Sequence, residues 1–185
     1  MPSRNPACEK AFVIAEQGGV YPLMSGHNCI AVATALLETG IVAMHEPVTH
    51  FQLEAPGGVV DIEAACSNGK AERISLRCPP AYARPSDRNL SIEVPELGTV
   101  HADVAFGGMH YCIVDAASIG LRLEPSNGRQ ICRLGEMIKV ACREQHPVQH
   151  PEFDYPGCDI LCFRGPLQRD ADGGVRARNT VVMSN

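Results

Sequence analysis

Residues 22–40 read PLMSGHNCIAVATALLETG, and this stretch decides the fold. Residues 28–39 favour an α-helix because they are rich in Ala and Leu, and Gly40 is a residue type that ends helices. Apolar side chains fall on every face of this predicted helix. Because a helix that is apolar all round belongs in an interior, we expect other elements to enclose it.

A short polar cluster, Ser25 to Asn28, lies at the head of this helix. The first N–H groups of a helix are unpaired and the helix dipole places about half a positive charge there, so such an end binds carboxylates and phosphates. Gly26 would let a ligand approach the backbone, Ser25 could exchange a proton with it, and His27 could orient a ligand amine or share the proton. The alternative is that Ser25 or Asn28 only caps the helix, which stabilises it by about 1 kcal/mol. Residue spacing alone leaves both interpretations open.

From residue 47 to 115 the sequence alternates between apolar and polar positions, with turn residues between the runs. This pattern predicts antiparallel hairpins. An apolar run at 11–16 predicts a buried strand, and two more strands are predicted at 159–165 and 176–183. A second helix is predicted at about 126–144, where four apolar residues share one face: Ile131, Leu134, Ile138 and Ala141. We therefore predict an α+β fold in which a curved sheet encloses one apolar helix.

Composition excludes several classes of protein. The 185 residues carry 16 Lys and Arg against 21 Asp and Glu, so a basic excess for nucleic-acid binding is lacking. No apolar run reaches the roughly 18 residues of a membrane span, and the start, MPSRNPACEK, lacks the apolar core of a signal peptide. We therefore expect a cytoplasmic protein without a membrane or nucleic-acid partner. The nine cysteines are interpreted as small buried hydrophobic residues.

No metal site is expected. His146 and His150 both flank prolines, so they do not form a helical i, i+4 pair, and no Cys-x-x-Cys accompanies them. Cys29 lies one turn inside the predicted helix, and we interpret it as a structural core residue.

Five segments follow one another over nearly the whole chain: PLMSGHNCIAVATALLETGIV (22–42), FQLEAPGGVVDIEA (51–64), VPELGTVHADVAFGGMHYCIVDA (94–116), IKVACREQHPVQHPE (138–152) and RARNTVVM (176–183). Together they resemble the proline racemase family, which includes hydroxyproline 2-epimerases and trans-3-hydroxy-L-proline dehydratases. The resemblance implies the diaminopimelate epimerase fold, with two pseudo-symmetric lobes that are each a curved antiparallel sheet around a central helix. It places the first lobe at 1–95 and the start of the second lobe at 96–185.

The resemblance also implies a catalytic site without a cofactor. In the family the N-termini of the two central helices face each other, and each carries an acid/base residue that acts on one face of the substrate α-carbon. Ser25 takes the first catalytic position, and Gly26, His27 and Asn28 take the position that helps to bind the substrate carboxylate. In the family the segment that corresponds to FGGMHY (106–111) lies close to the substrate, so the resemblance implies pocket walls at His110 and Tyr111. The alternative is a plain hairpin, which the two glycines suit by themselves.

Two departures from the family pattern bear on activity. Ser25 replaces the commoner Cys, and because a thiol ionises far more easily than an alcohol, Ser25 should be the weaker base. The second family motif, Asp-Arg-Ser-Pro-Cys-Gly-Thr-Gly, is absent from the sequence. We therefore expect a chain that is truncated at both ends, holds one of the two acid/base groups and is inactive alone.

The predicted activity is cofactor-independent proton abstraction from a hydroxyproline-type amino acid. A 4-hydroxyproline 2-epimerase is the first choice, because serine at this position argues against simple proline racemisation. The alternatives are a trans-3-hydroxy-L-proline dehydratase and a non-catalytic truncated remnant. The expected partners are a small proline-derived amino acid and, in a homodimer, a second copy of the chain.

Overall fold

A computed structural model describes residues 1–16 and 19–183 of the chain. Internal contacts divide it into two compact units, Met1–Pro80 (unit 1) and Ala81–Asn185 (unit 2). The division falls earlier than the boundary predicted between 95 and 96, because β5 (Leu90–Val94) pairs with β6 (Gly98–Phe106) and so belongs to the sheet of unit 2. The assignment of the two units to two lobes stays a prediction.

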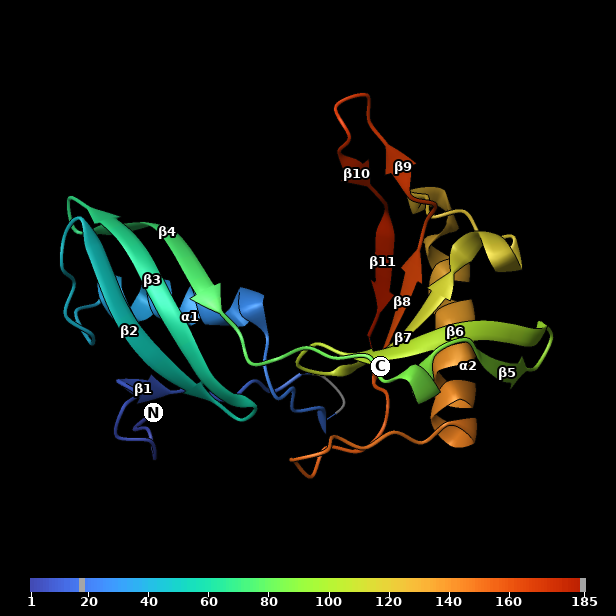
Figure 1. The fold of residues 1–185 in the computed structure, drawn as a ribbon, viewed down its shortest axis with the longest axis horizontal. Helices are drawn as coiled ribbons and strands as arrows, with labels where there is room; N and C mark the ends of the chain where they lie inside the picture. The colour runs from blue at the N-terminus through green and yellow to red at the C-terminus, as the bar shows by residue number, and fades with distance from the viewer. Residues whose placement is uncertain (17–18, 184–185) are drawn as a thin grey trace. The chain divides into compact units, whose positions relative to one another are not determined.

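Unit 1 is built on a four-stranded sheet in the order β1-β2-β3-β4 (Figure 1). Strands β2 and β3, and strands β3 and β4, pair antiparallel, which confirms the predicted hairpins. Alternate side chains such as Leu53, Val60 and Ile62 are buried while their neighbours face outward. The strands are β1 (Lys10–Ala11), β2 (Val48–Ala55), β3 (Gly58–Ser67) and β4 (Lys70–Arg77).

The predicted first helix is α1 (Gly26–Glu38), which lies along the buried face of this sheet (Figure 1). Cys29, Ala33 and Leu37 recur every four residues and bury one side of the helix in the core of unit 1. The structure differs from the expected enclosure, since Ile30 on the other side is 42% exposed. The reason is that the described strands of unit 1 cover the helix from one side.

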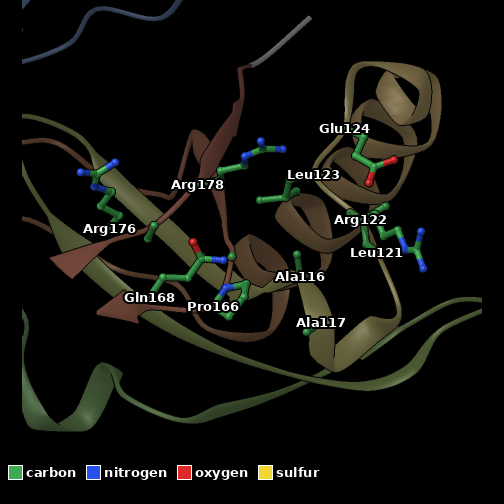
Figure 2. A pocket seen from close by; sticks show the side chains of 12 residues that line it. Ala116, Ala117, Leu121, Arg122, Leu123, Glu124, Pro166, Gln168, Arg176 and Arg178 are labelled. Atoms are coloured by element: carbon green, nitrogen blue, oxygen red, sulfur yellow. The ribbon is translucent and has the colours of Figure 1, made fainter. Parts of the chain in front are cut away.

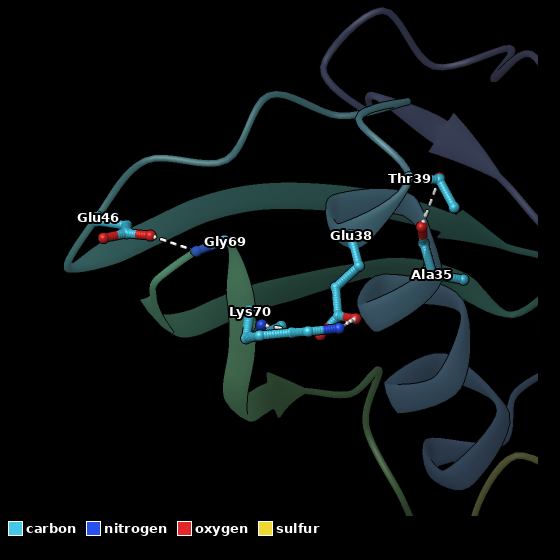
Figure 3. Close-up of polar contacts among 7 residues, drawn as sticks. Ala35, Glu38, Thr39, Glu46, Gly69 and Lys70 are labelled. Atoms are coloured by element: carbon cyan, nitrogen blue, oxygen red, sulfur yellow. Dashed lines mark hydrogen bonds and ion pairs between the residues drawn. The ribbon is translucent and has the colours of Figure 1, made fainter.

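The C-terminal end of α1 is bound to the first residues of β4 (Figure 3). Glu38 forms an ion pair of 2.8 Å with the Lys70 Nζ and accepts a hydrogen bond of 3.1 Å from the Ala71 N–H. The helix ends where predicted, because Gly40 follows the cap Thr39 with a positive φ of 72°. The C-terminal end of α1 is therefore fixed relative to the start of β4.

The strand predicted at 11–16 is much shorter in the structure. β1 ends at Ala11 and runs parallel to β2. Phe12 N–H still donates to Glu54 O at 3.0 Å, and Phe12 and Ile14 are buried in the core. The apolar run therefore marks core contacts of an irregular segment rather than a full strand.

Unit 2 contains a five-stranded sheet in the order β11-β8-β7-β6-β5 (Figure 1). Strands β5, β6 and β7 form antiparallel hairpins, which confirms the prediction from the alternating pattern. Strands β7 and β8, in contrast, run parallel. A parallel pair needs a crossover connection, and α2 (Gly128–Gln145) lies in it. The remaining elements are β7 (His110–Asp115), β8 (Ile160–Arg164), β9 (Gln168–Arg169), β10 (Val175–Arg176), β11 (Asn179–Val182) and three short 3₁₀ helices, η2 (Pro85–Asp87), η3 (Ala116–Ile119) and η4 (Pro125–Asn127).

The helix α2 confirms the second predicted helix and its buried face. The four residues named for that face, Ile131, Leu134, Ile138 and Ala141, all lie in the core of unit 2. Gly135 lies against β11, where an added Cβ would come within 2.5 Å of the Val182 Cγ2 atom. The glycine therefore permits the close approach of α2 to β11.

The buried face of α2 also carries a charge. The Lys139 side chain is 1% exposed, and its Nζ lies 2.7 Å from Glu136 Oε2 one turn earlier. Burial of an ammonium group is costly unless an opposite charge accompanies it. The pair with Glu136 therefore offsets part of the cost of burying the Lys139 ammonium group.

Over the described ranges 1–16 and 19–183, neither α1 nor α2 is long and apolar enough to cross a membrane.

The close contact at Gly135 predicts that Gly135→Ala destabilises unit 2. An added methyl group overlaps Val182, and overpacking of this kind costs about 1–3 kcal/mol. Gly128→Ala is the matched control, because nothing lies within 4 Å of its added Cβ and a glycine-to-alanine change in a helix otherwise stabilises by at most about 1 kcal/mol. Urea unfolding followed by circular dichroism measures both, and equal midpoints for the two variants would contradict the proposed contact.

Candidate active site

The N-terminus of α1 is the centre of the candidate site. Ser25 is the N-cap, with extended backbone angles of φ −143° and ψ 120°, and Cys29 N–H donates to its carbonyl oxygen at 3.0 Å. The Ser25 Oγ accepts hydrogen bonds from Asn28 Nδ2–H at 3.1 Å and from Asn28 N–H at 3.5 Å. The capping interpretation of Ser25 is thus realised in the structure.

The same helix end is open to a ligand within unit 1. Ser25, Gly26 and Asn28 are partly exposed and His27 is exposed. An added Cβ at Gly26 would meet only Leu76 Cδ1, at 3.9 Å. Within the part of the chain that the structure describes, the N–H groups of Gly26 and His27 have no acceptor. Among the described residues, these two unpaired donors lie next to the Ser25 hydroxyl at the start of α1.

This arrangement can bind an anion and stabilise negative charge next to it. The first turn, Gly26 to Cys29, carries no acidic side chain that would neutralise the positive end of the helix dipole. The two Asn28 donors would stabilise negative charge on Ser25 Oγ. The sequence reasoning missed the Asn28 side chain as a partner of Ser25; the Ser-x-x-Asn spacing, which resembles a capping box, is the signal that could have revealed it.

Cys29 is unsuited to nucleophilic chemistry. Its side chain is fully buried, and burial raises the pKa of the thiol to about 11, with a further contribution from the nearby Cys78. A thiol with such a pKa is protonated at neutral pH. The structure therefore supports the interpretation of Cys29 as a core residue.

His110 belongs to unit 2 and is buried there among aromatic rings. Its side chain is 2% exposed, its ring centroid lies 5.2 Å from that of Phe106 and 5.9 Å from that of Tyr155, and its Nε2 is 3.3 Å from the Tyr82 hydroxyl. Burial lowers the pKa of His110, and the neighbouring His150 lowers it further. This burial suits a packing role in the β6–β7 hairpin, the alternative considered from the sequence, and the role of His110 as a pocket wall stays a prediction.

Tyr111 points to the opposite face of the same sheet and is partly exposed. Burial of its ring raises the pKa of its hydroxyl above the ordinary value. Ser25 lies in unit 1 and Tyr111 in unit 2. The role of Tyr111 as a pocket wall stays a prediction.

In the described ranges, no group of three or more His, Cys, Asp or Glu side chains lies close enough together to hold a metal ion. The groups that the chain itself presents at the α1 N-terminus are the Ser25 hydroxyl, the His27 imidazole and backbone N–H donors. That the reaction proceeds without a cofactor stays a prediction.

Known proteins match the chain along its whole length. The family model for proline racemase matches residues 1–185. A structure described as a probable proline racemase from Agrobacterium radiobacter K84, with bound carbonate, superposes with a TM-score of 0.84 at 34% identity, over 97% of this chain and 52% of the other. A hydroxyproline epimerase from Agrobacterium vitis, with bound trans-4-hydroxy-L-proline, gives a TM-score of 0.84 at 31% identity, over 97% and 50%. A methylitaconate-delta-isomerase shares the fold, with a TM-score of 0.56 at 13% identity over 98% and 59%.

The capping geometry predicts the effect of mutations at Ser25 on stability. Ser25→Ala removes the acceptor for the Asn28 donors and should lower the free energy of unfolding by about 1 kcal/mol, whereas Ser25→Gly should cost only a few tenths of a kcal/mol. Chemical denaturation of the two variants beside the wild type measures the difference. A Ser25→Ala protein as stable as the wild type would show that the cap contributes nothing.

The buried His110 predicts a loss of stability in mild acid. The pKa of His110 is lower in the folded chain than in the unfolded chain, where it is about 6.5. Its contribution to the free energy of unfolding is therefore complete above the unfolded pKa and is lost as the pH falls from there toward the folded pKa. Thermal unfolding between pH 8 and pH 5 should therefore show a smaller decrease for His110→Phe than for the wild type. His101→Gln, which alters an exposed histidine, is the control and should keep the wild-type slope. An unchanged slope in His110→Phe would contradict the assignment.

Proposed function

The chain belongs to the proline racemase family, and from that membership we propose that its α1 N-terminus is one acid/base half of a site that acts on the α-carbon of a hydroxyproline-type amino acid. The chain spans about half the length of the solved structures that it matches. The proposal therefore concerns the role of this half-site, with Ser25 as its acid/base residue.

The observation that carries the proposal is the pair of unpaired N–H groups beside the Ser25 hydroxyl. A substrate carboxylate on the N–H groups of Gly26 and His27 would complete the first turn of α1. The α-carbon is one bond from that carboxylate, so it would lie next to Ser25 Oγ. The arrangement suits proton transfer at this carbon.

The proposed step breaks the bond between the α-carbon and its hydrogen. Ser25 Oγ, once deprotonated, takes the proton, and the electron pair remains on the substrate as an enolate-like carbanion whose charge spreads into the carboxylate. The N–H donors of Gly26 and His27 would stabilise that charge, and the exposed His27 ring could take the Ser25 proton beforehand. Inversion then requires a proton donor on the opposite face. The family motif for that donor is absent from this sequence.

The substrate that we propose is 4-hydroxyproline, with 2-epimerisation as the reaction. The serine in place of cysteine and the similarity to the Agrobacterium vitis enzyme, which was solved with trans-4-hydroxy-L-proline, support this choice. Dehydration of trans-3-hydroxy-L-proline would begin with the same proton abstraction and differ in the loss of a β-hydroxyl from the carbanion. A non-catalytic binding role is the third possibility. The cytoplasmic location and the homodimer stay predictions.

A titration of the ¹⁵N-labelled chain followed by NMR tests the half-site. Trans-4-hydroxy-L-proline should shift the amide signals of Gly26, His27 and Asn28 more than any others, with a dissociation constant of about 1 mM or weaker, because a helix end contributes only about 0.3–2 kcal/mol. Trans-4-hydroxy-L-prolinol, which lacks the carboxylate, is the control ligand and should leave these signals unchanged. Equal shifts with both ligands, or the largest shifts elsewhere, would contradict the site.

Incubation in D₂O with trans-4-hydroxy-L-proline and trans-3-hydroxy-L-proline tests the reaction. Because one acid/base group serves one face, we expect no epimer and no dehydration product from this chain, detected by ¹H NMR. Epimer formation that is lost in Ser25→Ala would show instead that a single group is sufficient. Tighter binding of the 3-hydroxy isomer in the titration would favour the dehydratase alternative.

A further inference from the structure

Unit 2 contains a hollow that the proposed half-site does not use (Figure 2). One wall is the segment 116–124, and the other comes from 165–168 and 176–178. Its volume of about 700 Å³ lies in the range of small-molecule sites. The size and concave shape of the hollow therefore suit a small molecule as the ligand.

The charges of the hollow are mainly positive. Three arginines line it, Arg122, Arg176 and Arg178, against one acidic residue, Glu124. The Arg176 guanidinium is paired with Asp170 at 2.6 Å. Within residues 1–16 and 19–183, the guanidinium groups of Arg122 and Arg178 have no ion pair or hydrogen bond. Two cationic side chains are thus free to bind an anion.

The backbone of Arg178 is held in place while its side chain is free. Gly165 N–H donates to Arg178 O at 2.7 Å, and an added Cβ at Gly165 would come within 3.3 Å of that oxygen. The Arg178 side chain reaches across the hollow toward Leu123 (Figure 2). A guanidinium on a fixed backbone can bind a carboxylate or a phosphate with two parallel hydrogen bonds.

Part of the hollow is apolar. Leu123 is partly exposed and Ala117 and Pro166 are exposed, whereas Leu121 and Ala116, which also line it, are buried. A purely ionic ligand would leave this surface in contact with water. A ligand with an anionic head and an apolar body would cover both parts.

We propose that this hollow binds a small molecule that carries one anionic head, a carboxylate or a phosphate, on an apolar body. Arg178 binds the head, Arg122 and Arg176 add positive charge at the rim, and the side chains of Leu123 and Pro166 contact the body. The site lies wholly in unit 2, so the proposal is independent of the role of Ser25.

Isothermal titration of the full 185-residue chain with hexanoate, hexyl phosphate and 1-hexanol tests the proposal. Either anion should bind saturably and at least fivefold tighter than the alcohol, and the tighter of the two identifies the head. Arg178→Gln should weaken that binding by about fivefold to tenfold. Arg129→Gln, which removes an exposed arginine of α2 outside the hollow, is the matched control and should have no effect.

A second variant acts on the opposite wall. Ala117→Phe places a ring in the hollow at an exposed position, so it should reduce binding of both anions without altering the fold. The proposal is overturned if neither anion binds, if 1-hexanol binds as tightly, or if Arg129→Gln weakens binding as much as Arg178→Gln.

Discussion

The packing of α1 on the sheet of unit 1 is the contact on which the candidate site depends. Cys29, Ala33 and Leu37 share one face, so their burial fixes the rotation of the helix about its axis. Burial of one leucine stabilises by about 1.5–3 kcal/mol, whereas a serine cap contributes about 1 kcal/mol. The core contacts therefore hold the helix, and the exposed helix end follows from them.

The capping and catalytic interpretations of Ser25 are compatible in this geometry. The hydroxyl oxygen accepts hydrogen bonds from Asn28, while the N–H groups of Gly26 and His27 remain for a ligand. Donors that stabilise the helix end would also stabilise charge on Ser25 Oγ. A single set of contacts can thus position the residue and prepare it for proton transfer.

The arrangement of unit 2 depends on a different constraint, the crossover connection that two parallel strands require. Because β7 and β8 run in the same direction, the chain must return along the sheet, and α2 does so. The close approach at Gly135 and the buried Lys139 both result from this packing. Beyond β8 the chain forms the small β9–β10 ribbon, and the basic hollow lies between this region and the segment after β7.

The sequence by itself determined the elements whose signal is local and periodic. Both helices, the hairpins of β2 to β4 and of β5 to β7, and the cluster at Ser25 were predicted from spacing and residue type, because side-chain period and capping chemistry act over a few residues. Tertiary structure decided what depends on distant partners. It ended β1 at Ala11, made β7 and β8 parallel, placed His110 among aromatic rings and left Ile30 exposed. Each of these outcomes depends on which segments meet in space, and a pattern along one segment carries no information about its distant partner.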